Sequence, residues 1–372
     1  MSNTADAGTT QTQMAREIAE QPAALRATLD ALVPRREEIR RRLDGRRHVL
    51  FAARGSSDNA AIYGRYLLET HARVPAGLVS PSVATQYRSP LDLSDAVVVG
   101  VSQSGRTSEI VQTLAWARSC GAFTMAVSND ESSDLAASAD LALTTMAGRE
   151  LAVPATKSYL TQVAAMTVLG TALGPQDAAL DTALAEAPDR VEAVLADAAR
   201  LEPVVAQLAE GDSHGGSAGP WAANIIVTGR GLMMGTALEI ALKLEETCAR
   251  PVRGYSYADL RHGPISAVQE GVAAVLVGAA DGPLHDAMIE LADDLRARGA
   301  TTVAVGGSPA MADACDLATG PLDVTERLAP LVTVVPMQIV VERLARSLGL
   351  DPDEPRGLSK VTRTDVPTQE ES

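Results

Sequence analysis

Aromatic residues are scarce in this chain of 372 residues, since Phe, Trp and Tyr together make up 3% of it. We therefore expect a core built from aliphatic and alanine side chains. Cysteine is also rare: Cys120, Cys248 and Cys315 lie far apart, and no C-x-x-C spacing is present. This pattern argues against both a disulfide framework and a zinc site. We predict three small buried side chains in a protein of the reducing cytoplasm.

Long apolar runs are missing as well. No stretch of 18 apolar residues offers a membrane span, and residues 1–14 lack the basic-then-apolar pattern of a signal peptide. Positive charge is outnumbered, with 32 Lys and Arg against 47 Asp and Glu and a formal net charge of −15. Because such a surface repels phosphate backbones, we expect neither nucleic acid nor a membrane as partner.

The two halves of the chain contain matching segments in the same order. Residues 67–73 match 244–250, residues 96–100 match 274–278, and residues 121–127 match 299–305. The offset is 177 or 178 residues each time. One short apolar match is within chance, but three at a near-constant offset indicate two copies of one domain.

Each copy alternates short apolar runs with helical stretches. In the first copy, we predict strands at 48–53, 96–101 and 124–128 and helices at 59–70 and 108–118. The apolar runs are continuous rather than alternating, which is typical of parallel strands covered on both faces. The fold class is therefore α/β, with two tandem doubly wound, flavodoxin-like parallel-sheet domains.

The expected domain organisation has five parts. An amphipathic helical stretch at 16–44, with Leu25, Leu29 and Leu32 on one stripe, leads into the first domain. A boundary is expected in the Gly/Ser/Asp-rich stretch 210–219. Composition alone predicts disorder after Asp351. The five parts are an extension and helix at 1–44, domain one at 45–190, a helical linker at 191–219, domain two at 220–350, and a tail at 351–372.

Hydroxyl groups crowd one strand-to-helix junction, residues 101–108, with the sequence Val-Ser-Gln-Ser-Gly-Arg-Thr-Ser. A helix N-terminus favours an anion, and Ser and Thr side chains add donors. An ordinary Ser/Thr-capped helix is the alternative. Two observations favour phosphate: Gly55-Ser56-Ser57 follows the first strand at the same sheet edge, and the equivalent stretch of the second copy, 279–282, has no hydroxyls.

Glu239, Lys243 and Glu246 recur at i, i+4 and i+7, which places them on one helix face. A solvated salt-bridge stripe is the simpler interpretation. This helix, however, follows the strand-end sequence 228–231, which puts its face near a cleft. A carboxylate held beside a lysine there is suited to moving a proton.

His262 precedes Gly263-Pro264 on a turn. From spacing alone, a capping or core histidine is the better interpretation. The other four histidines have no comparable context, and no metal-ligand pattern is present, so we expect no metal.

Taken together, these motifs resemble the sugar isomerase (SIS) family, and within it the isomerase half of the glucosamine-6-phosphate synthases. The matching segments run in the expected order from residue 14 to 362, nearly the whole chain. They are residues 17–22, 102–107, 155–157, 238–246, 260–264 and 355–360.

The resemblance implies a role for each matching position. Hydroxyl and amide side chains would hold a sugar 6-phosphate, and these are Ser57, Ser102, Gln103, Ser104 and Thr107. Two further residues would line the sugar site, Val153 and Ala155. The tail would fold over this site rather than remain disordered.

The catalytic roles come from the same resemblance. Glu246 would move a proton between C1 and C2, and Lys243 would assist near the reacting end. His262, supplied by the neighbouring subunit of a homodimer, would open the sugar ring. Lys360 would form an imine with a ketose or contact its open chain. No metal or other cofactor is needed if donors hold the oxyanion.

Two departures from the synthase pattern shape the expected function. No residues remain for a glutamine-hydrolysing domain, and Arg106 stands where the family often has an acidic residue. We therefore expect an isomerase–deaminase that converts glucosamine 6-phosphate into fructose 6-phosphate and ammonia. Two alternatives stay open: a lyase that eliminates the C3 substituent of N-acetylglucosamine 6-phosphate, and a non-catalytic sugar-phosphate sensor.

Overall fold

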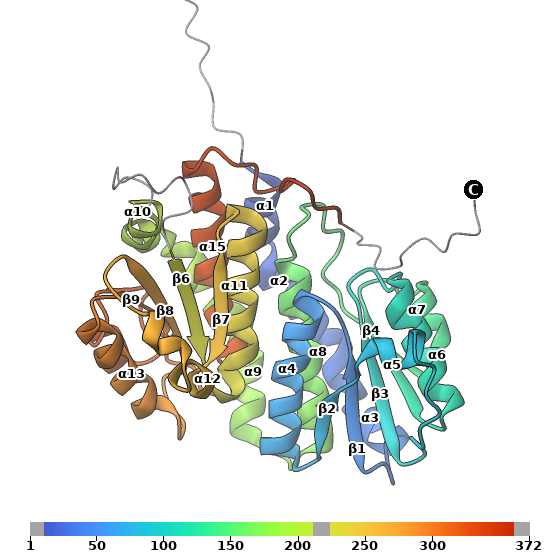
Figure 1. Ribbon diagram of the computed structural model, residues 1–372. Coiled ribbons are helices and arrows are strands. Elements are labelled where there is room, and N and C mark those ends of the chain that lie inside the picture. The colour runs from blue at the N-terminus through green and yellow to red at the C-terminus, as the bar shows by residue number, and fades with distance from the viewer. Residues whose placement is uncertain (1–10, 211–223, 361–372) are drawn as a thin grey trace, which may run out of the picture.

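Two parallel sheets form the framework of the protein, for which a computed structural model describes residues 11–210 and 224–360 (Figure 1). Within these residues each sheet has five strands, in the orders β2-β1-β3-β4-β5 and β10-β9-β8-β6-β7. The first sheet contains β1 His48–Ala52, β2 Ala76–Leu78, β3 Ala96–Val101, β4 Phe123–Ser128 and β5 Leu141–Thr144. The second contains β6 Asn224–Gly229, β7 Val252–Ser256, β8 Val272–Gly278, β9 Thr301–Gly306 and β10 Leu317–Ala318.

Fifteen α-helices surround the sheets in the described part of the chain. Those of the first half are α1 Gln13–Ala19, α2 Gln21–Leu32, α3 Arg36–Arg42, α4 Ser56–Leu67, α5 Pro81–Thr85, α6 Ser108–Ser119, α7 Asp134–Ser138, α8 Lys157–Leu173 and α9 Ala178–Ala196. Those of the second half are α10 Glu202–Glu210, α11 Met234–Cys248, α12 Tyr257–Arg261, α13 His285–Ala297, α14 Pro309–Asp313 and α15 Pro330–Ser347.

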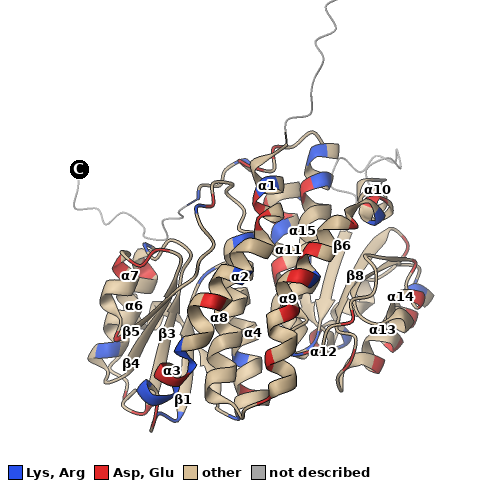
Figure 2. Cartoon of the chain, turned by 180° about the vertical axis from the view of Figure 1, so that it is seen from behind, with Lys and Arg blue, Asp and Glu red and all other residues tan. Residues whose placement is uncertain are grey.

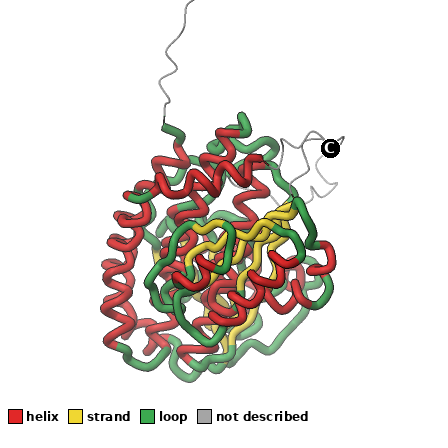
Figure 3. Tube along the Cα trace, turned by 90° about the vertical axis from the view of Figure 1, so that its left-hand side faces the viewer, coloured by secondary structure: helices red, strands yellow, loops and turns green. Residues whose placement is uncertain are grey.

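The central strands are buried on both faces, as their continuous apolar runs predict. All six residues of β3 are buried, and Val97, Val98 and Val99 are fully inaccessible to solvent. Every strand pairing is parallel. Figure 3, seen from the side of the second sheet, shows the strands between layers of helices. The α/β class and the doubly wound arrangement are confirmed.

The internal duplication is confirmed by the matching strand orders. Replacing β1–β5 by β6–β10 in turn converts one sheet order into the other, read in the opposite direction. The strands β4 and β9, which begin at Phe123 and Thr301, keep the 178-residue offset read from the sequence. The two copies therefore share one topology.

The expected lead-in at 16–44 is helical but not one helix. It is divided into α1, α2 and α3, with Pro22 at the start of α2 and Pro34 in a 3₁₀ turn before α3. Proline lacks an amide proton and is best accommodated in the first turn of a helix, and Pro22 and Pro34 each lie at the start of a new helical segment. Leu25, Leu29 and Leu32 are buried, as their shared stripe predicts.

The helices α4, α8, α11 and α15 fill the space between the two sheets (Figure 1). Nearly every residue of α8 is buried, because helices contact it on several sides. The helices α4 and α11 approach closely at Gly235: a Cβ built there would lie 2.3 Å from the carbonyl oxygen of Asn59. This contact fixes the face of α11 against the first copy.

The chain after α15 returns over the top of the molecule toward the first sheet (Figure 1). Both carboxylate oxygens of Asp353 accept bonds from the first amides of α1, those of Gln13 at 2.8 Å and Met14 at 2.7 Å. The amide of Val153 donates to the carbonyl of Asp353 at 2.8 Å. The tail is thus tied to the N-terminal helix and to the loop before α8.

Several expectations concern other parts of the chain. Cys248 and Cys315 are buried and Cys120 is half-buried, all as free thiols. Among the described helices, none has both the length and the apolar character needed to cross a membrane. Basic and acidic residues are interspersed over the rear helices (Figure 2). The boundary stretch expected at 210–219 lies almost entirely outside the described residues, and position 190, the expected end of domain one, lies inside α9.

Candidate functional site

A cavity of about 340 Å³ opens at the carboxyl ends of β1 and β3, beside the C-terminal half of α11. Ligands bind at this edge of open α/β sheets. Of the candidate site residues from the sequence, all but His262 and Glu239 line the cavity. The lining residues are Arg54, Gly55, Ser56, Ser57, Ser102, Gln103, Ser104, Thr107, Ile110, Glu150, Val153, Ala155, Lys243, Glu246, Leu358, Ser359 and Lys360.

The loop between β3 and α6 forms one end of this cavity. Gly105 adopts φ +61°, and a Cβ there would lie 2.2 Å from the hydroxyl of Ser133, so only glycine fits. The tight turn brings the hydroxyls of Ser102 and Thr107 to 3.1 Å from each other. The hydroxyl of Ser104 accepts a bond from the amide of Arg106 at 3.2 Å. The hydroxyls of this loop and the amides at the start of α6 thus lie at the same end of the cavity.

The N-terminus of α4 adjoins that of α6 at this end of the cavity. Gly55, with φ +56°, turns the chain from β1 into α4, and Ser56 and Ser57 open that helix. The N-termini of α4 and α6, both twelve-residue helices, therefore meet at the cavity. Because helix N-termini carry partial positive charge and free amides, this end of the cavity suits a phosphate group.

The charged face of α11 forms the opposite wall. Lys243 is 2% exposed and donates to the carboxylate of Glu246, and its Nζ lies 3.6 Å from Oε1 of Glu239. Burial alone would lower the pKa of Lys243, but the two carboxylates outweigh it and raise the pKa, so the ammonium stays charged. The three residues do share one face, on which Glu239 and Lys243 are buried and Glu246 is partly exposed.

Glu239 lies beneath the cavity rather than on its surface. Its side chain is fully buried and accepts a bond from Asn59 of α4 at 2.9 Å. Burial raises the pKa of Glu239 to about 7, although Lys243 and Asn59 act in the opposite direction. This carboxyl joins the two helices that carry the two halves of the site.

The tail supplies a further cation, Lys360. The Nζ of Lys360 donates to Glu150 at 2.7 Å and to the carbonyl of Ala152 at 2.7 Å. Glu150 also accepts from the hydroxyl and amide of Ser158. Burial alone would raise the pKa of Glu150, but the charge of Lys360 and these hydrogen bonds hold it below its usual value. Glu150 therefore remains ionised and holds Lys360 at the cavity.

His262 lies apart from these groups. It follows α12 as its C-cap, its side chain is exposed, and its backbone amide donates to the carbonyls of Ala258 and Asp259. Within one chain it does not line the cavity. That it serves a neighbouring subunit stays a prediction.

Two charged lining residues, Arg54 and Glu150, were not expected from the sequence. Arg54 directly precedes the segment Gly55-Ser56-Ser57, but nothing in its local spacing indicates its ion-pair partner, and the same holds for Glu150. Their partners, Glu109 and Lys360, lie 55 and 210 residues away along the chain. Only the folded arrangement brings these pairs together.

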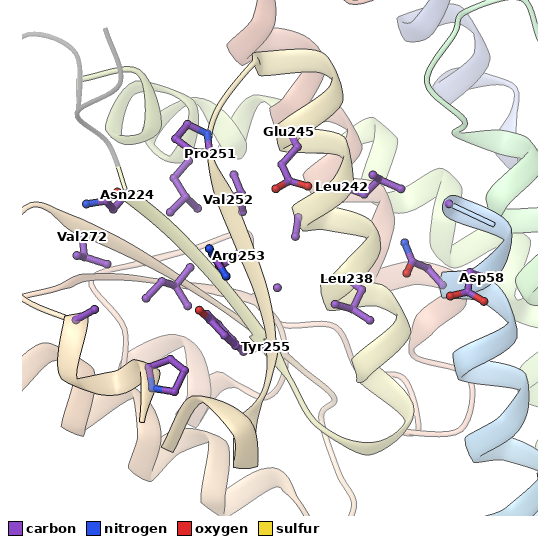
Figure 4. A pocket seen from close by; sticks show the side chains of 18 residues that line it. Asp58, Asn224, Leu238, Leu242, Glu245, Pro251, Val252, Arg253, Tyr255 and Val272 are labelled. Carbon is purple, nitrogen blue, oxygen red and sulfur yellow. The ribbon is translucent and has the colours of Figure 1, made fainter. Parts of the chain in front are cut away.

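A larger cavity of about 940 Å³ lies on the other side of α11 (Figure 4). It is lined by Leu238, Leu242 and Glu245 of α11 and by Val252 and Tyr255 of β7 (Figure 4). Among the described residues, its lining lacks both the hydroxyl cluster and a lysine. We assign the chemistry to the smaller cavity, because hydroxyls, carboxylates and ammonium groups converge there.

The corresponding edge of the second sheet is filled. The cavity there measures about 10 Å³. Leu284 and Glu326 occupy the space, lying 2.6 Å and 2.4 Å from Cβ positions built at Gly231 and Gly282. The sequence 279–282 also lacks hydroxyls. Among residues 11–210 and 224–360, no group of three or more His, Cys, Asp or Glu is placed to hold a metal ion.

Sequence comparisons place these observations among known proteins. A profile of the SIS domain matches residues 43–172 and 221–343. The glutamine–fructose-6-phosphate aminotransferases of Thermococcus kodakarensis and Symbiobacterium thermophilum are 32% and 35% identical to the chain, over 359 and 372 residues. Each match covers 93% of this chain but 57% and 58% of the relative, so the chain spans slightly more than half the length of these proteins.

Solved structures are similar over nearly the whole chain. A provisionally assigned phosphosugar isomerase from Silicibacter pomeroyi has a TM-score of 0.79 and 31% identity, covering 92% of this chain and 100% of that one. The C-terminal domain of glucosamine-fructose-6-phosphate aminotransferase from Francisella tularensis has a TM-score of 0.78 and 26% identity, covering 94% and 100%. A glucosamine-6-phosphate deaminase from Thermotoga maritima, with a TM-score of 0.75, 23% identity and coverage of 95% and 100%, shares the fold.

Proposed function

The chain belongs to the SIS domain family, and on that basis we propose that it is an isomerase–deaminase that converts glucosamine 6-phosphate into fructose 6-phosphate and ammonia. The observation that carries this proposal is the composition of the 340 Å³ cavity. Hydroxyls and helix N-termini at one end suit a phosphate, and a lysine–carboxylate pair at the other end suits proton transfer. The relatives named for amino-sugar phosphates support the substrate class.

The phosphate is held by the hydroxyl end of the cavity in this proposal. The amides at the start of α4 and α6 and the hydroxyls of Ser57, Ser102, Ser104 and Thr107 donate to its oxygens, and Gln103 adds an amide. Binding at C6 places the opposite end of the open-chain sugar toward α11. Val153 and Ala155 line the path between the two ends.

The carboxylate of Glu246 then moves one proton. It takes the proton from C2 of the open-chain aldehyde, where the adjacent carbonyl makes that proton acidic, and returns it to C1 through an enolamine. The ammonium of Lys243 stabilises the negative charge that develops on the oxygen. The resulting C2 imine reacts with water, which gives the ketose and releases ammonia. Lys360 contacts the open chain from the tail.

We also place a second copy of the chain in this proposal. Ring opening needs a proton donor and acceptor, and within one chain the exposed His262 lies outside the cavity. A homodimer in which His262 of each chain reaches the cavity of its partner supplies that group.

The test is an assay of two substrates in parallel. The protein is incubated separately with glucosamine 6-phosphate and with N-acetylglucosamine 6-phosphate, and ammonia, ketose phosphate and unsaturated sugar are measured. We expect ammonia and ketose phosphate in equal amounts from the first substrate only, and none of either from a Glu246→Gln control.

Other outcomes contradict the proposal in different ways. Unsaturated sugar from the acetylated substrate would identify a lyase instead. Binding of either sugar phosphate without turnover would identify a sensor.

A further inference from the structure

Arg54 and Glu109 form a two-pronged ion pair at the phosphate end of the cavity. The Nε of Arg54 donates to Oε2 of Glu109 at 2.9 Å, and its Nη2 donates to Oε1 at 2.8 Å. Arg54 follows β1, whereas Glu109 lies in the first turn of α6. Such fork-to-fork bonding fixes the plane of the guanidinium group.

The pair is buried on one side and open on the other. The side chain of Glu109 is 12% exposed, while that of Arg54 is 49% exposed and lines the cavity. A guanidinium group has five N–H donors, and the two bonds to Glu109 use two of them. Three donors therefore remain, including both on Nη1, on a side chain that lines the cavity.

The nearby Arg106 is placed differently, although it lies inside the hydroxyl-rich loop. Its guanidinium donates to Asp130 at 3.2 Å, its side chain is 64% exposed, and it is not among the residues that line the cavity. At the phosphate end of the cavity, Arg54 is therefore the arginine within reach among the described residues.

The second copy of the domain provides an internal comparison. Arg230-Gly231 follows β6 as Arg54-Gly55 follows β1, and both glycines have a positive φ, +59° and +56°. At the 178-residue offset, the counterpart of Glu109 is Ala287. Arg230 instead lies over the ring of Tyr257, 4.4 Å from its centroid. The copy that lacks the hydroxyls therefore also lacks the carboxylate that fixes the arginine.

We propose that Arg54, positioned by Glu109, binds the phosphate of the substrate and selects doubly charged phosphate esters over singly charged or uncharged sugars. This inference rests on the proposed function only in that a sugar phosphate occupies the cavity. The physical reason is the donor type: the hydroxyls and amides of the loop carry no formal charge, whereas the guanidinium that Glu109 holds in place brings a cationic group with further N–H donors to the phosphate.

A simpler role for Arg54 is to neutralise the buried Glu109, and three variants distinguish the two roles. They are Arg54→Gln, the double variant Arg54→Gln with Glu109→Gln, and the matched control Arg106→Gln. Affinity for fructose 6-phosphate is measured by calorimetry, and folding is followed by thermal unfolding. We expect Arg54→Gln to weaken binding by about 10- to 100-fold, the range for a hydrogen bond between charged groups, and Arg106→Gln to change it by less than about threefold.

The double variant decides between the roles even if Arg54→Gln alone fails to fold, because it leaves no unpaired buried charge. If Arg54 only neutralises Glu109, the double variant binds as tightly as wild type, which would overturn the proposal. If Arg54 binds phosphate, the double variant stays weak by about the same 10- to 100-fold factor.

Selectivity gives an independent readout. Wild type should prefer glucosamine 6-phosphate to glucosamine 6-sulfate, which carries one negative charge fewer on that group, and Arg54→Gln should reduce this preference by about tenfold. An unchanged preference contradicts the inference about Arg54 alone. If wild type binds neither glucosamine 6-phosphate nor fructose 6-phosphate, the proposed function itself fails. Failure of the inference about Arg54 and failure of the proposed function are therefore distinguishable.

Discussion

The two ends of the cavity carry different side chains. Hydroxyls and the ion-paired Arg54 line the phosphate end, while Lys243, Glu246 and Lys360 line the other end. The carboxylate of Glu246 is 26% exposed, so it is accessible to a ligand, whereas Glu239 beneath it is inaccessible. At the residue scale, this division identifies Glu246 rather than Glu239 as the group that can contact substrate.

The substitution Glu246→Gln tests the proposed base. It keeps the size of the side chain but removes the proton acceptor. We expect exchange of the C2 proton of bound glucosamine 6-phosphate with deuterated water to stop, while affinity for the sugar phosphate changes little. Nuclear magnetic resonance follows the exchange. Continued exchange at the wild-type rate would exclude Glu246 as the base.

The buried carboxyl of Glu239 predicts a pH-dependent stability. Its pKa in the folded protein is about 7, against an ordinary value of 4.5, so the folded state binds its proton more tightly. The folded state is stabilised relative to the unfolded state by this tighter proton binding. The stabilisation is fully present below about pH 4.5 and is lost as the pH rises through 7. Between pH 5 and pH 8 the loss is on the order of 2 to 3 kcal/mol.

Urea unfolding of wild type and Glu239→Gln at both pH values measures this effect. Glutamine stays neutral at both pH values. The difference in unfolding free energy between wild type and the variant should therefore shift against wild type by on the order of 2 to 3 kcal/mol from pH 5 to pH 8. A difference that is equal at the two pH values would show that Glu239 does not titrate in this window.

Sequence reasoning found the site residues that form patterns and missed those that do not. The hydroxyls of Ser102, Ser104 and Thr107 stand out because they are clustered, and Lys243 and Glu246 because they share a helix face. Glu150 has no such neighbours, and its ion pair with Lys360 arises only when the tail crosses the first domain. A contact between distant segments leaves no trace in local spacing.

At the scale of elements, the crossing of α4 and α11 aligns the two walls of the cavity. The helix α4 begins at the hydroxyl-lined end, and α11 carries Lys243 and Glu246, the residues proposed to move the proton. The bond between Asn59 and Glu239 joins them near the point where Gly235 allows close approach. Any change that separates the helices moves Glu246 away from a bound sugar.

We predict that Gly235→Ala separates these helices. The new Cβ would lie 2.3 Å from a backbone oxygen, which cannot move independently, so unfolding free energy should fall by about 1–3 kcal/mol and turnover should decrease. Gly64→Ala is the matched control, because its Cβ would meet the flexible end of Met166 at 2.8 Å. Chemical unfolding and turnover should change much less in this control. Equal effects of both substitutions would contradict the alignment argument.

Element prediction succeeded for long buried strands and failed for short edge strands. The predicted strand at 96–101 coincides with β3, and those at 48–53 and 124–128 differ from β1 and β4 by one residue. The strands β2 and β10, with three and two residues, were not predicted. A strand at a sheet edge needs few apolar residues, and its pairing depends on the neighbour rather than on its own sequence.

At the scale of the whole molecule, each active site is proposed to need two chains. Ser104 lines the cavity of its own chain, while His262 lies outside that cavity. The variant Ser104→Arg, whose larger side chain blocks the phosphate end of the cavity, should be inactive. The variant His262→Ala should also be inactive. In a mixed dimer of the two, one site carries both changes and the other carries neither.

Co-expression with two different tags allows the mixed dimer to be purified. It should regain about half of wild-type activity, since one of its two sites is intact. If each site were built within one chain, every site would carry one change. A mixed dimer as inactive as its parents would therefore refute the shared site.

The filled cleft of the second copy determines how many ligands one chain can take. Duplication created two sheet edges of the same topology, but Leu284 and Glu326 leave a space of about 10 Å³ at the second. At least about 10–15 Å³ of such space is needed to hold a single water, so no sugar can enter. Calorimetric titration with fructose 6-phosphate should therefore saturate at one ligand per chain, in a single phase, despite the twofold repeat. The second copy of the domain, whose own cleft is filled, contributes α11, and this helix forms one wall of the cavity in the first copy.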